Sequence, residues 1–554
     1  MKQGKKRFKG QQRGRAVDQE AIQEIRDLIG PATPRRDRLI EYLHLIQDRH
    51  GCITSAHCVA LAHEMKLSTT EVYEVATFYH HFDVLKDGDP RPPEITVRVC
   101  ESVTCEMFGA PALMQELAQR CGAGVRIQPV PCVGRCDGAP VAVVGNNPIE
   151  RAGADAVTEA VKQRDVAAPP TAHSGYADYR AAGGYTLLEQ CQSGKRTRDA
   201  VIEALQESKL RGLGGAGFPA GTKWSILKNQ PGPRLIAVNI DEGEPGTFKD
   251  RYYLERDPHR FIEGMLIAAW AIEAEACYIY IRDEYTACRH ALEKELEALR
   301  SDPPGPLPDI ELRRGAGAYI CGEESAMIES IEGKRGLPRL RPPYVAEVGL
   351  FGRPTLEHNL ETLHWVRDIL ERGAEAFSAH GRRDRTGLRS FSVSGRVKKP
   401  GVHVAPAGIS VRELIDEYCD GMLDGHEFYG YFPGGASGGI LPASLGDEPL
   451  DFDTLQKHGS FIGSAAVIIL SDKDNARTAA LNAMRFFEHE SCGQCTPCRV
   501  GTAKAAILMK QKQWDTGLLE ELARAMEDAS ICGLGQAAPN PMRCAIRYFP
   551  QEFE

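Results

Sequence analysis

The sequence lacks the features that would place the protein in a membrane, outside the cell or on nucleic acid. Its 554 residues contain no uninterrupted apolar run of about 20 residues, the length that spans a bilayer. The nearest case, Gly264 to Ile281, carries Glu273 and Glu275 and predicts a buried helix that runs into a strand. The basic start is not followed by an apolar stretch, so it does not resemble a signal peptide. A net charge of −9 gives no basis for nucleic-acid binding. We therefore expect a soluble, cytoplasmic protein.

The first fifteen residues lack acidic side chains altogether, although Lys and Arg recur there. With its Gly and Gln content, this stretch favours a flexible, solvated tail over an arm that docks on an acidic partner. We expect a basic flexible arm over residues 1–33.

Cysteine is abundant, with 17 residues, and the absence of an export signal argues for metal clusters in a reducing compartment rather than for disulfides. Near the C-terminus three cysteines are spaced C-x2-C-x2-C and a fourth follows at a distance: Cys492, Cys495, Cys498 and Cys532. This spacing is typical of one [4Fe–4S] cluster. Zinc prefers paired CxxC motifs or Cys/His mixtures, so it fits less well.

A second cysteine group lies in an expected α/β unit. Alternating Ile95, Val97 and Val99 predict a strand, residues 110–120 a helix, and residues 125–130 and 141–144 two further strands. One cysteine pair follows each of the first two strands: Cys100 with Cys105, and Cys132 with Cys136. Two thiolates per iron suit a [2Fe–2S] cluster, and zinc is the alternative.

Three segments in the middle of the chain predict a nucleotide site. Residues 210–224 are dense in glycine and include Lys223; an apolar strand at 235–238 runs into an acidic stretch; residues 314–324 combine small residues, Tyr319 and a carboxylate pair. Glycines let backbone amides approach an anion or a flat ring, and open α/β sheets place ligands at the carboxyl ends of strands.

With these motifs the chain resembles two subunits of the NADH module of respiratory complex I, fused into one polypeptide. Residues 34 to about 150 are similar to the thioredoxin-like [2Fe–2S] subunit, and residues from about 185 onward to its flavoprotein partner. Over its whole length the chain most resembles the β (diaphorase) subunits of metal-dependent, NAD-linked formate dehydrogenases. The resemblance implies that FMN and NAD are held by Gly212, Gly214, Gly215, Gly217, Phe218, Lys223, Asn239, Asp241, Glu242, Glu244, Tyr319, Gly322, Glu323, Glu324, Arg341, Tyr344, His358 and Asn359.

Within this set the resemblance places Lys223 and the loop glycines at the FMN phosphate, and Phe218 on nicotinamide or adenine. Carboxylates near the adenosine ribose would favour NAD(H) over NADP(H). Two positions depart from the family pattern: His358 stands where an Asn is usual, and Arg341 and Tyr344 replace a Lys and a Phe around the Pro-Pro pair. An imidazole can still donate to phosphate.

The expected fold class is multidomain α/β. The predicted order is a basic arm (1–33), a helical bundle (34–88), a thioredoxin-like [2Fe–2S] domain (89–150), a linker (151–184), a Rossmann-like FMN/NAD domain (185–385), a ubiquitin-like β-grasp domain (386–470) and a helical [4Fe–4S] domain (471–554).

The predicted chemistry is hydride transfer between NAD(H) and FMN, which requires no catalytic acid or base from the protein. FMN would then exchange single electrons with the clusters. Nothing in the chain resembles a pterin site, so formate oxidation would belong to a separate molybdenum or tungsten subunit in a hetero-oligomer. The alternatives are the diaphorase of an NAD-reducing hydrogenase, a fused complex I-type NADH dehydrogenase subunit and, from another class, a redox-inactive docking scaffold.

Overall fold

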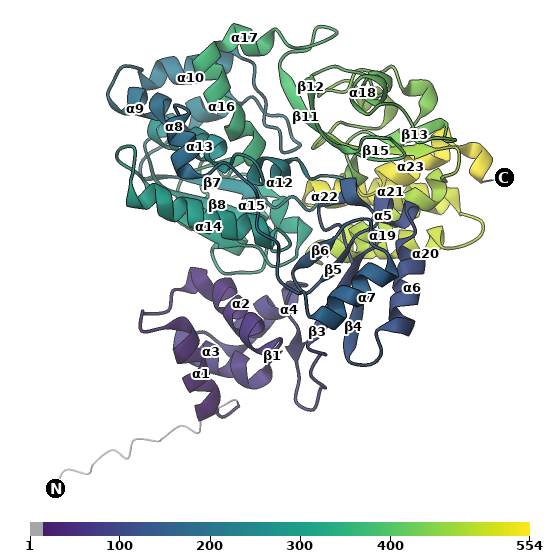
Figure 1. Cartoon of the computed structure of the whole chain (residues 1–554), viewed down its shortest axis with the longest axis horizontal. Coiled ribbons are helices and arrows are strands. Elements are labelled where there is room, and N and C mark those ends of the chain that lie inside the picture. The colour runs from purple at the N-terminus through teal and green to yellow at the C-terminus, as the bar shows by residue number, and fades with distance from the viewer. Residues whose placement is uncertain (1–14, 554) are drawn as a thin grey trace. The chain divides into compact units, whose positions relative to one another are not determined.

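The computed structural model describes residues 15–553, which divide into two compact units (Figure 1). The first unit runs to Pro92 and also includes the short segment Gly333–Arg335; the second holds the remaining residues. Among residues 15–553, no helix is both long enough and apolar enough to cross a bilayer.

The first unit is a small helical bundle with one pair of parallel two-residue strands. Its elements are α1 (Gln19–Ile29), α2 (Leu39–His50), β1 (Ile53–Thr54), α3 (Ser55–Met65), α4 (Thr69–Phe78) and β2 (Val84–Leu85). The predicted flexible arm over residues 1–33 is corrected for residues 19–29. These form α1, because Ile22 and Ile25 share one buried face and the Asp18 carboxylate caps its first amides. The expectation for residues 1–14 lies outside the described residues.

The second unit begins with a four-stranded mixed sheet in the order β4-β3-β5-β6. Strands β3 and β4 are parallel, whereas β5 runs antiparallel to both β3 and β6. The elements are β3 (Ile95–Cys100), α5 (Val103–Met107), α6 (Ala110–Arg120), β4 (Val125–Val130), β5 (Ala142–Val144), β6 (Asn147–Ile149) and α7 (Ala154–Gln163). Helix α7 occupies part of the predicted linker, and its Val157 is buried in the core of this sheet.

A parallel four-stranded sheet in the order β10-β7-β8-β9 forms the centre of the second unit. Its elements are α8 (Tyr176–Ala181), α9 (Thr186–Gln192), α10 (Arg198–Glu207), α11 (Ala220–Lys228), β7 (Arg234–Ile240), α12 (Lys249–Leu254), α13 (Pro258–Ile272), β8 (Ala274–Ile281), α14 (Thr286–Ser301), β9 (Asp309–Arg314), α15 (Glu324–Ile331), β10 (Thr355–Asn359), α16 (Leu360–Arg372) and α17 (Ala374–Ser378). The predicted helix running into a strand over residues 264–281 is confirmed by α13 and β8. Strands β8 and β9 extend the sheet on one side of β7, and β10 joins on the other. The order therefore reverses between β10 and β7, which is where open α/β sheets bind ligands.

The rest of the second unit is a five-stranded mixed sheet followed by helices, and the sheet order is β12-β11-β15-β13-β14. The elements are β11 (Leu388–Gly395), β12 (Gly401–Pro406), α18 (Val411–Tyr418), β13 (Phe428–Phe432), β14 (Leu441–Pro442), β15 (Ala466–Ser471), α19 (Ala476–Glu490), α20 (Thr496–Met509), α21 (Thr516–Ala529), α22 (Gly533–Ala537) and α23 (Asn540–Tyr548). This sheet and α18 cover the region where a β-grasp domain is predicted, and the named domain layout stays a prediction.

The segment that joins the first sheet to the parallel sheet is anchored at Glu295. Its carboxylate accepts hydrogen bonds from His173 Nε2 at 3.0 Å and from the backbone N–H of Tyr176 at 2.7 Å. It also accepts from His259 Nε2 at 3.0 Å, while His259 Nδ1 accepts from the hydroxyl of Tyr185 at 2.7 Å. Although burial acts to raise it, the pKa of Glu295 falls from 4.5 to about 2, because the bonds from both histidines and the amide outweigh the burial.

Replacing Glu295 by Gln is expected to destabilise this anchor by about 2 kcal/mol at neutral pH, since buried donors lose a charged acceptor. The pKa of Glu295 is lowered on folding, so its contribution is complete above about pH 4.5 and is lost as the pH falls toward 2. Urea titrations can follow the release of this anchor by proteolysis of residues 164–175. The difference in stability between the variant and the parent protein should decrease below about pH 4.5. The control is Glu293→Gln on the same helix, an exposed residue paired with Arg289, which should cost less than about 0.5 kcal/mol. Equal losses in both variants would contradict the anchoring role.

Candidate functional site

The carboxyl ends of β7 and β10 bring two asparagines side by side. Asn239 and Asn359 are register partners, and the side-chain amide of Asn359 donates to the Asn239 carbonyl at 3.3 Å and to Asp250 at 2.6 Å. The side-chain amide of Asn239 donates to the carbonyl of Gly322 at 2.9 Å. Both predicted asparagines thus lie at the reversal of strand order.

The glycine-rich loop lies against this edge. It is closed by backbone hydrogen bonds from Gly212 N–H to the Phe218 carbonyl and from Ala220 N–H to the Leu210 carbonyl, each 2.8 Å long. A Cβ on Gly214 would lie 3.0 Å from Cβ of Asn359, so a side chain there would crowd the edge. Gly214 itself is exposed, and the side chain of Phe218 is 48% exposed. The loop therefore presents bare backbone and one aromatic ring to a ligand.

The acidic stretch after β7 gives its carboxylates different tasks. Oδ2 of Asp241 is buried without a hydrogen-bond partner, and burial raises the pKa of this carboxyl well above its usual value. The carboxylate of Glu242 turns inward and accepts from the N–H groups of Asp250 at 2.8 Å and Arg251 at 3.2 Å. Burial, followed by the charge of Asp250, raises the pKa of Glu242 to about 7. Asp241 is thus the carboxyl with hydrogen-bonding capacity left for a bound group.

Glu244 connects this stretch to the segment around Tyr319. It accepts from the Tyr319 hydroxyl and, at 2.7 Å, from the N–H of Ser437. The N–H of Tyr319 in turn donates to Glu490 at 2.9 Å, and Glu490 is the last residue of α19. Sequence reasoning did not find Glu490, because a single Glu outside any motif carries no signal.

Glu323 and Glu324 begin helix α15, but only one of them is free of helix capping. The carboxylate of Glu323 accepts from Ser325 N–H at 3.0 Å and Ala326 N–H at 2.9 Å, so Glu323 is the N-cap. Arg341 forms ion pairs with both carboxylates, and its Nη2 lies 2.9 Å from Oε1 of Glu324. Tyr344, three residues after Arg341, is 55% exposed.

Two of the predicted phosphate ligands already have protein partners. Lys223 Nζ donates to the Glu357 carbonyl at 2.8 Å and lies 3.7 Å from the Glu324 carboxylate. His358 is buried on β10, and its Nε2 accepts from the indole N–H of Trp224 at 2.8 Å. Burial, followed by the charge of Lys223, lowers the pKa of His358 well below its usual value. The imidazole is therefore neutral, and any donation to phosphate would have to come from Nδ1.

The four predicted [2Fe–2S] cysteines meet at the ends of β3 and β4. Each is at most 3% exposed and none forms a disulfide. Sγ of Cys132 lies 3.3 Å from Sγ of Cys136, and the thiol of Cys100 is within hydrogen-bonding reach of Cys105 and Cys132. Phe248, just beyond the acidic stretch, packs against Cys132 and Cys136. Four buried thiols around one point fit the predicted cluster.

The four predicted [4Fe–4S] cysteines come from two helix starts and the loop before them. Cys495 is the N-cap of α20, Cys498 lies in the first turn of that helix, and Cys532 is the N-cap of α22. Cys498 and Cys532 both lie close enough to Cys492 to be affected by its charge. A Cβ on Gly535 would lie 2.8 Å from Cβ of Cys498, so the glycine allows the two segments to approach. The set fits one cube held by two segments.

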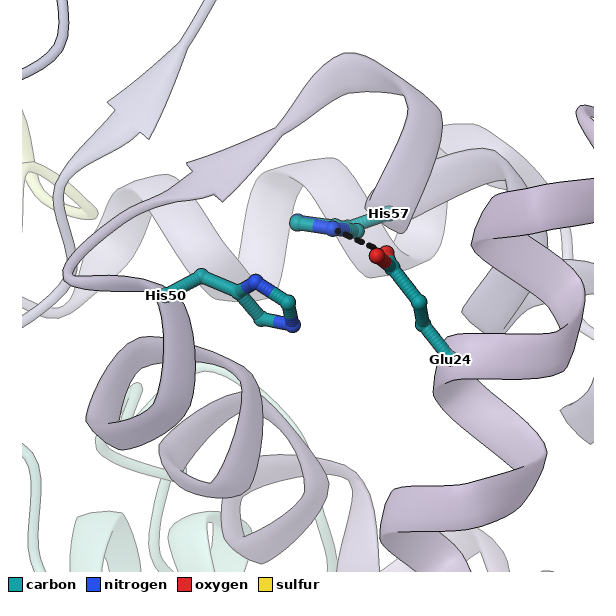
Figure 2. A group of neighbouring side chains, drawn as sticks. All are labelled: Glu24, His50 and His57. Atoms are coloured by element: carbon teal, nitrogen blue, oxygen red, sulfur yellow. Dashed lines mark hydrogen bonds and ion pairs between the residues drawn. The ribbon is translucent and has the colours of Figure 1, made fainter.

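A further group of side chains, in the first unit, has the residue types of a metal site, but its hydrogen bonds leave His57 unable to bind a metal. Figure 2 shows Glu24, His50 and His57 directed toward one another from three helices. His57 Nδ1 accepts the N–H of Thr54 at 3.2 Å as part of the capping box of α3. The neutral ring therefore carries its proton on Nε2, which lies 3.2 Å from Glu24 and donates to it. No lone pair of the His57 ring is left for a metal, so we assign these residues a structural role.

Comparisons with known proteins agree with these three centres. The family model described as the Nuo51 FMN-binding domain matches residues 205–368. The NADH-ubiquinone oxidoreductase-F iron-sulfur binding region matches residues 478–554, and the thioredoxin-like [2Fe–2S] ferredoxin model matches residues 25–165.

Whole-chain comparisons extend this similarity. The chain is 42% identical over 390 residues to the F 2 subunit of NADH-quinone oxidoreductase from Rhizobium meliloti, and the match covers 68% of this chain and 92% of the relative. It is also 42% identical over 401 residues to the NADH-quinone oxidoreductase F subunit of Aquifex aeolicus, covering 70% and 92% respectively. Among solved structures, a chain of an NAD+-reducing [NiFe]-hydrogenase in the H2-reduced state aligns with a TM-score of 0.82 and 32% identity, covering 94% of this chain and 92% of that one.

Proposed function

Because the chain belongs to the family of NADH-quinone oxidoreductase F subunits, we propose that it is the diaphorase component of a larger NAD-linked enzyme, in which a separate subunit supplies or consumes the electrons. The chain is an NAD(H)-dependent oxidoreductase with FMN-binding, [2Fe–2S] and [4Fe–4S] domains in one polypeptide. FMN, when bound, supplies both the hydride exchange with NAD(H) and the single-electron exchange with the clusters.

The main observation behind the proposal is that one loop, residues 241–248, contacts all three proposed cofactor regions. At one end, Asp241 offers a partnerless buried oxygen at the ligand edge of the parallel sheet. In the middle, the Glu244 carboxylate accepts a hydrogen bond from the hydroxyl of Tyr319. The backbone N–H of Tyr319 donates in turn to Glu490 in the C-terminal helices. At the other end, Phe248 packs on Cys132 and Cys136. One short loop thus supports the proposed flavin site and both proposed clusters.

In this proposal, Asn239, Asn359, Asp241 and the loop glycines hold FMN, and Phe218 and Tyr344 stack on the nucleotide. The protein's own part is to bind, orient and exclude water, since no side chain has to exchange a proton with the substrate. The buried Oδ2 atom of Asp241 and the bare backbone at Gly214 support this assignment.

The proposed partner is a molybdenum- or tungsten-dependent protein that oxidises formate, on the strength of whole-chain resemblance. A hydrogen-activating partner is the second candidate, favoured by the alignment of 94% of this chain with a chain of an NAD+-reducing hydrogenase. Purification of the native complex and anaerobic assays with formate, hydrogen and NADH decide between them. Formate-driven NAD+ reduction supports the first partner and hydrogen-driven reduction the second. Loss of NADH–dye activity in a preparation that retains flavin and iron would contradict the diaphorase itself.

Exchanging Glu324 for Arg is expected to relax discrimination against NADP(H) by about tenfold or more, because like charges placed together cost several kcal/mol. Glu324 is chosen because Glu323 is committed to capping α15. The ratio of kcat/KM for NADH and NADPH measures the effect. The matched control, Glu323→Gln, should weaken the helix start by about 1 kcal/mol without changing that ratio. An unchanged ratio in Glu324→Arg would remove this residue from the nucleotide site.

A further inference from the structure

A buried arginine at the carboxyl end of β8 contacts two of the three proposed redox sites of the second unit, the [2Fe–2S] loop and the edge of the flavin site. Arg282 follows directly after Ile281, the last residue of β8, and is 4% exposed. Its Nη2 donates to the carbonyl of Cys132 at 2.7 Å, and its Nη1 donates to the carbonyl of Glu242. One guanidinium therefore holds a proposed cluster ligand and the acidic loop beside the proposed flavin site.

A tyrosine on the same turn strengthens this connection. The hydroxyl of Tyr285 donates to the Glu242 carboxylate at 2.8 Å. On its other side, a Cβ added to Gly134 would lie 2.2 Å from that hydroxyl, so the cluster loop is in close contact with Tyr285. The backbone of Gly246 is also hydrogen-bonded to Cys132 and Cys136. The cluster loop and loop 241–248 are thus packed against each other through several independent contacts.

Arg282 and Arg251 both contact the cluster loop, but their positive charges are balanced differently by carboxylates. Arg251 also donates to the cluster loop, at the Gly134 carbonyl, but it pairs with two carboxylates, Asp137 at 2.7 Å and Glu255 at 3.0 Å. Arg282 pairs with Glu284 at 3.0 Å, and the Glu284 side chain is 32% exposed. Water reaches that carboxylate and screens it, whereas the guanidinium beside Cys132 lies in a dry environment.

We propose that Arg282 is a positioning residue for the [2Fe–2S] cluster: its permanent charge raises the reduction potential of the cluster, and its two carbonyl contacts fix the cluster loop against the flavin edge. When bound, the cluster would accept one electron supplied by FMN that NADH has reduced, and this transfer would form or break no bond in the protein. The reduced cluster carries one more negative charge, and a nearby cation stabilises that form. This inference rests on the cluster assignment in the proposed function.

The test is an EPR-monitored redox titration of the [2Fe–2S] cluster in the full chain loaded with its cofactors. Arg282→Met should keep the cluster signal and move its midpoint to a more negative potential. Arg282→Lys keeps the charge but not the forked geometry, and its midpoint should stay close to that of the parent. Arg389→Met is the matched control: Arg389 is also buried and paired with one carboxylate, Asp451 at 2.9 Å, but its guanidinium lies over the ring of Phe452 and not beside a cluster cysteine. This control should leave the midpoint unchanged.

A fourth variant tests the charge without touching the buried arginine. Glu284→Gln removes the screened counter-charge at the edge of the site, so the midpoint should move in the opposite direction, to a less negative potential. A Met variant with the parental midpoint, a Lys variant shifted as far as the Met variant, or a Glu284→Gln midpoint that does not rise would each overturn the charge role. If the unaltered chain gave no [2Fe–2S] signal, the cluster assignment itself would fall, and the inference with it.

Discussion

Cys532→Ala is expected to abolish the [4Fe–4S] signal while leaving the reaction of NADH with the flavin in place. Cys532 caps α22 and brings the fourth thiol to the three at the start of α20, namely Cys492, Cys495 and Cys498. Substituting residues that only support metal ligands already lowers metal affinity or activity by about 10- to 100-fold. Loss of a ligand should therefore reduce electron output to a one-electron protein acceptor by more than about 100-fold. Flavin bleaching by NADH, followed in a stopped-flow instrument, should persist.

The control for this prediction is a cysteine of the same domain that takes no part in the motif. Cys544 lies on α23, is 2% exposed and has its thiol 3.6 Å from the Gly459 carbonyl. Cys544→Ala should keep the full iron content and the [4Fe–4S] EPR signal. An intact signal in Cys532→Ala would show that another residue closes the cluster.

Local patterns in the sequence were sufficient to predict some of the helices and strands. The predicted helix at 110–120 and the strand at 125–130 are confirmed with the same bounds by α6 and β4. Helix α6 has Pro111 in its first turn and buried Leu113 and Leu117 one turn apart, and β4 begins with the alternating residues Val125, Arg126, Ile127 and Gln128. The cysteine spacings likewise led to two sets of thiols that the fold brings together.

What sequence reasoning missed depends on contacts between distant segments. Arg282 has no motif around it, and its importance comes from a carbonyl at position 132, 150 residues away. Likewise the inward turn of Glu242 depends on the amides that begin α12, and the capping role of Glu323 depends on where α15 starts. Runs of Asp and Glu predict that carboxylates gather at a site, but not which of them the protein itself uses.

Segment 151–184 shows the limit of composition as a guide. Its Ala and Pro content favours a linker, and yet α7 and α8 form within it because Val157 and Tyr176 find buried surroundings. Tertiary burial decided these elements against the local composition.

Lys249→Met is expected to have the largest effect on stability, about 3 to 5 kcal/mol, because it removes one partner from a buried ion group. Lys249 is 1% exposed, and its Nζ lies 2.9 Å from Asp250, 3.1 Å from Glu361 and 2.9 Å from the side-chain oxygen of Asn359. Without the ammonium group, the buried carboxylates of Asp250 and Glu361 lose the cation that they share. Denaturant unfolding of the apoprotein, followed by the fluorescence of Trp224 and Trp365 in the surrounding core, should report the loss.

The exposed pair of Lys228 and Asp199 provides the matched control. The carboxylate of Asp199 is 84% exposed, so Lys228→Met should cost less than about 1 kcal/mol. Because Asn359 stands at the ligand edge, Lys249→Met should also weaken FMN retention, and added FMN should restore part of the lost stability. Equal effects of the two lysine substitutions would mean that Asp250 and Glu361 are relieved by water or by protonation. The buried group would then contribute no more than a surface ion pair.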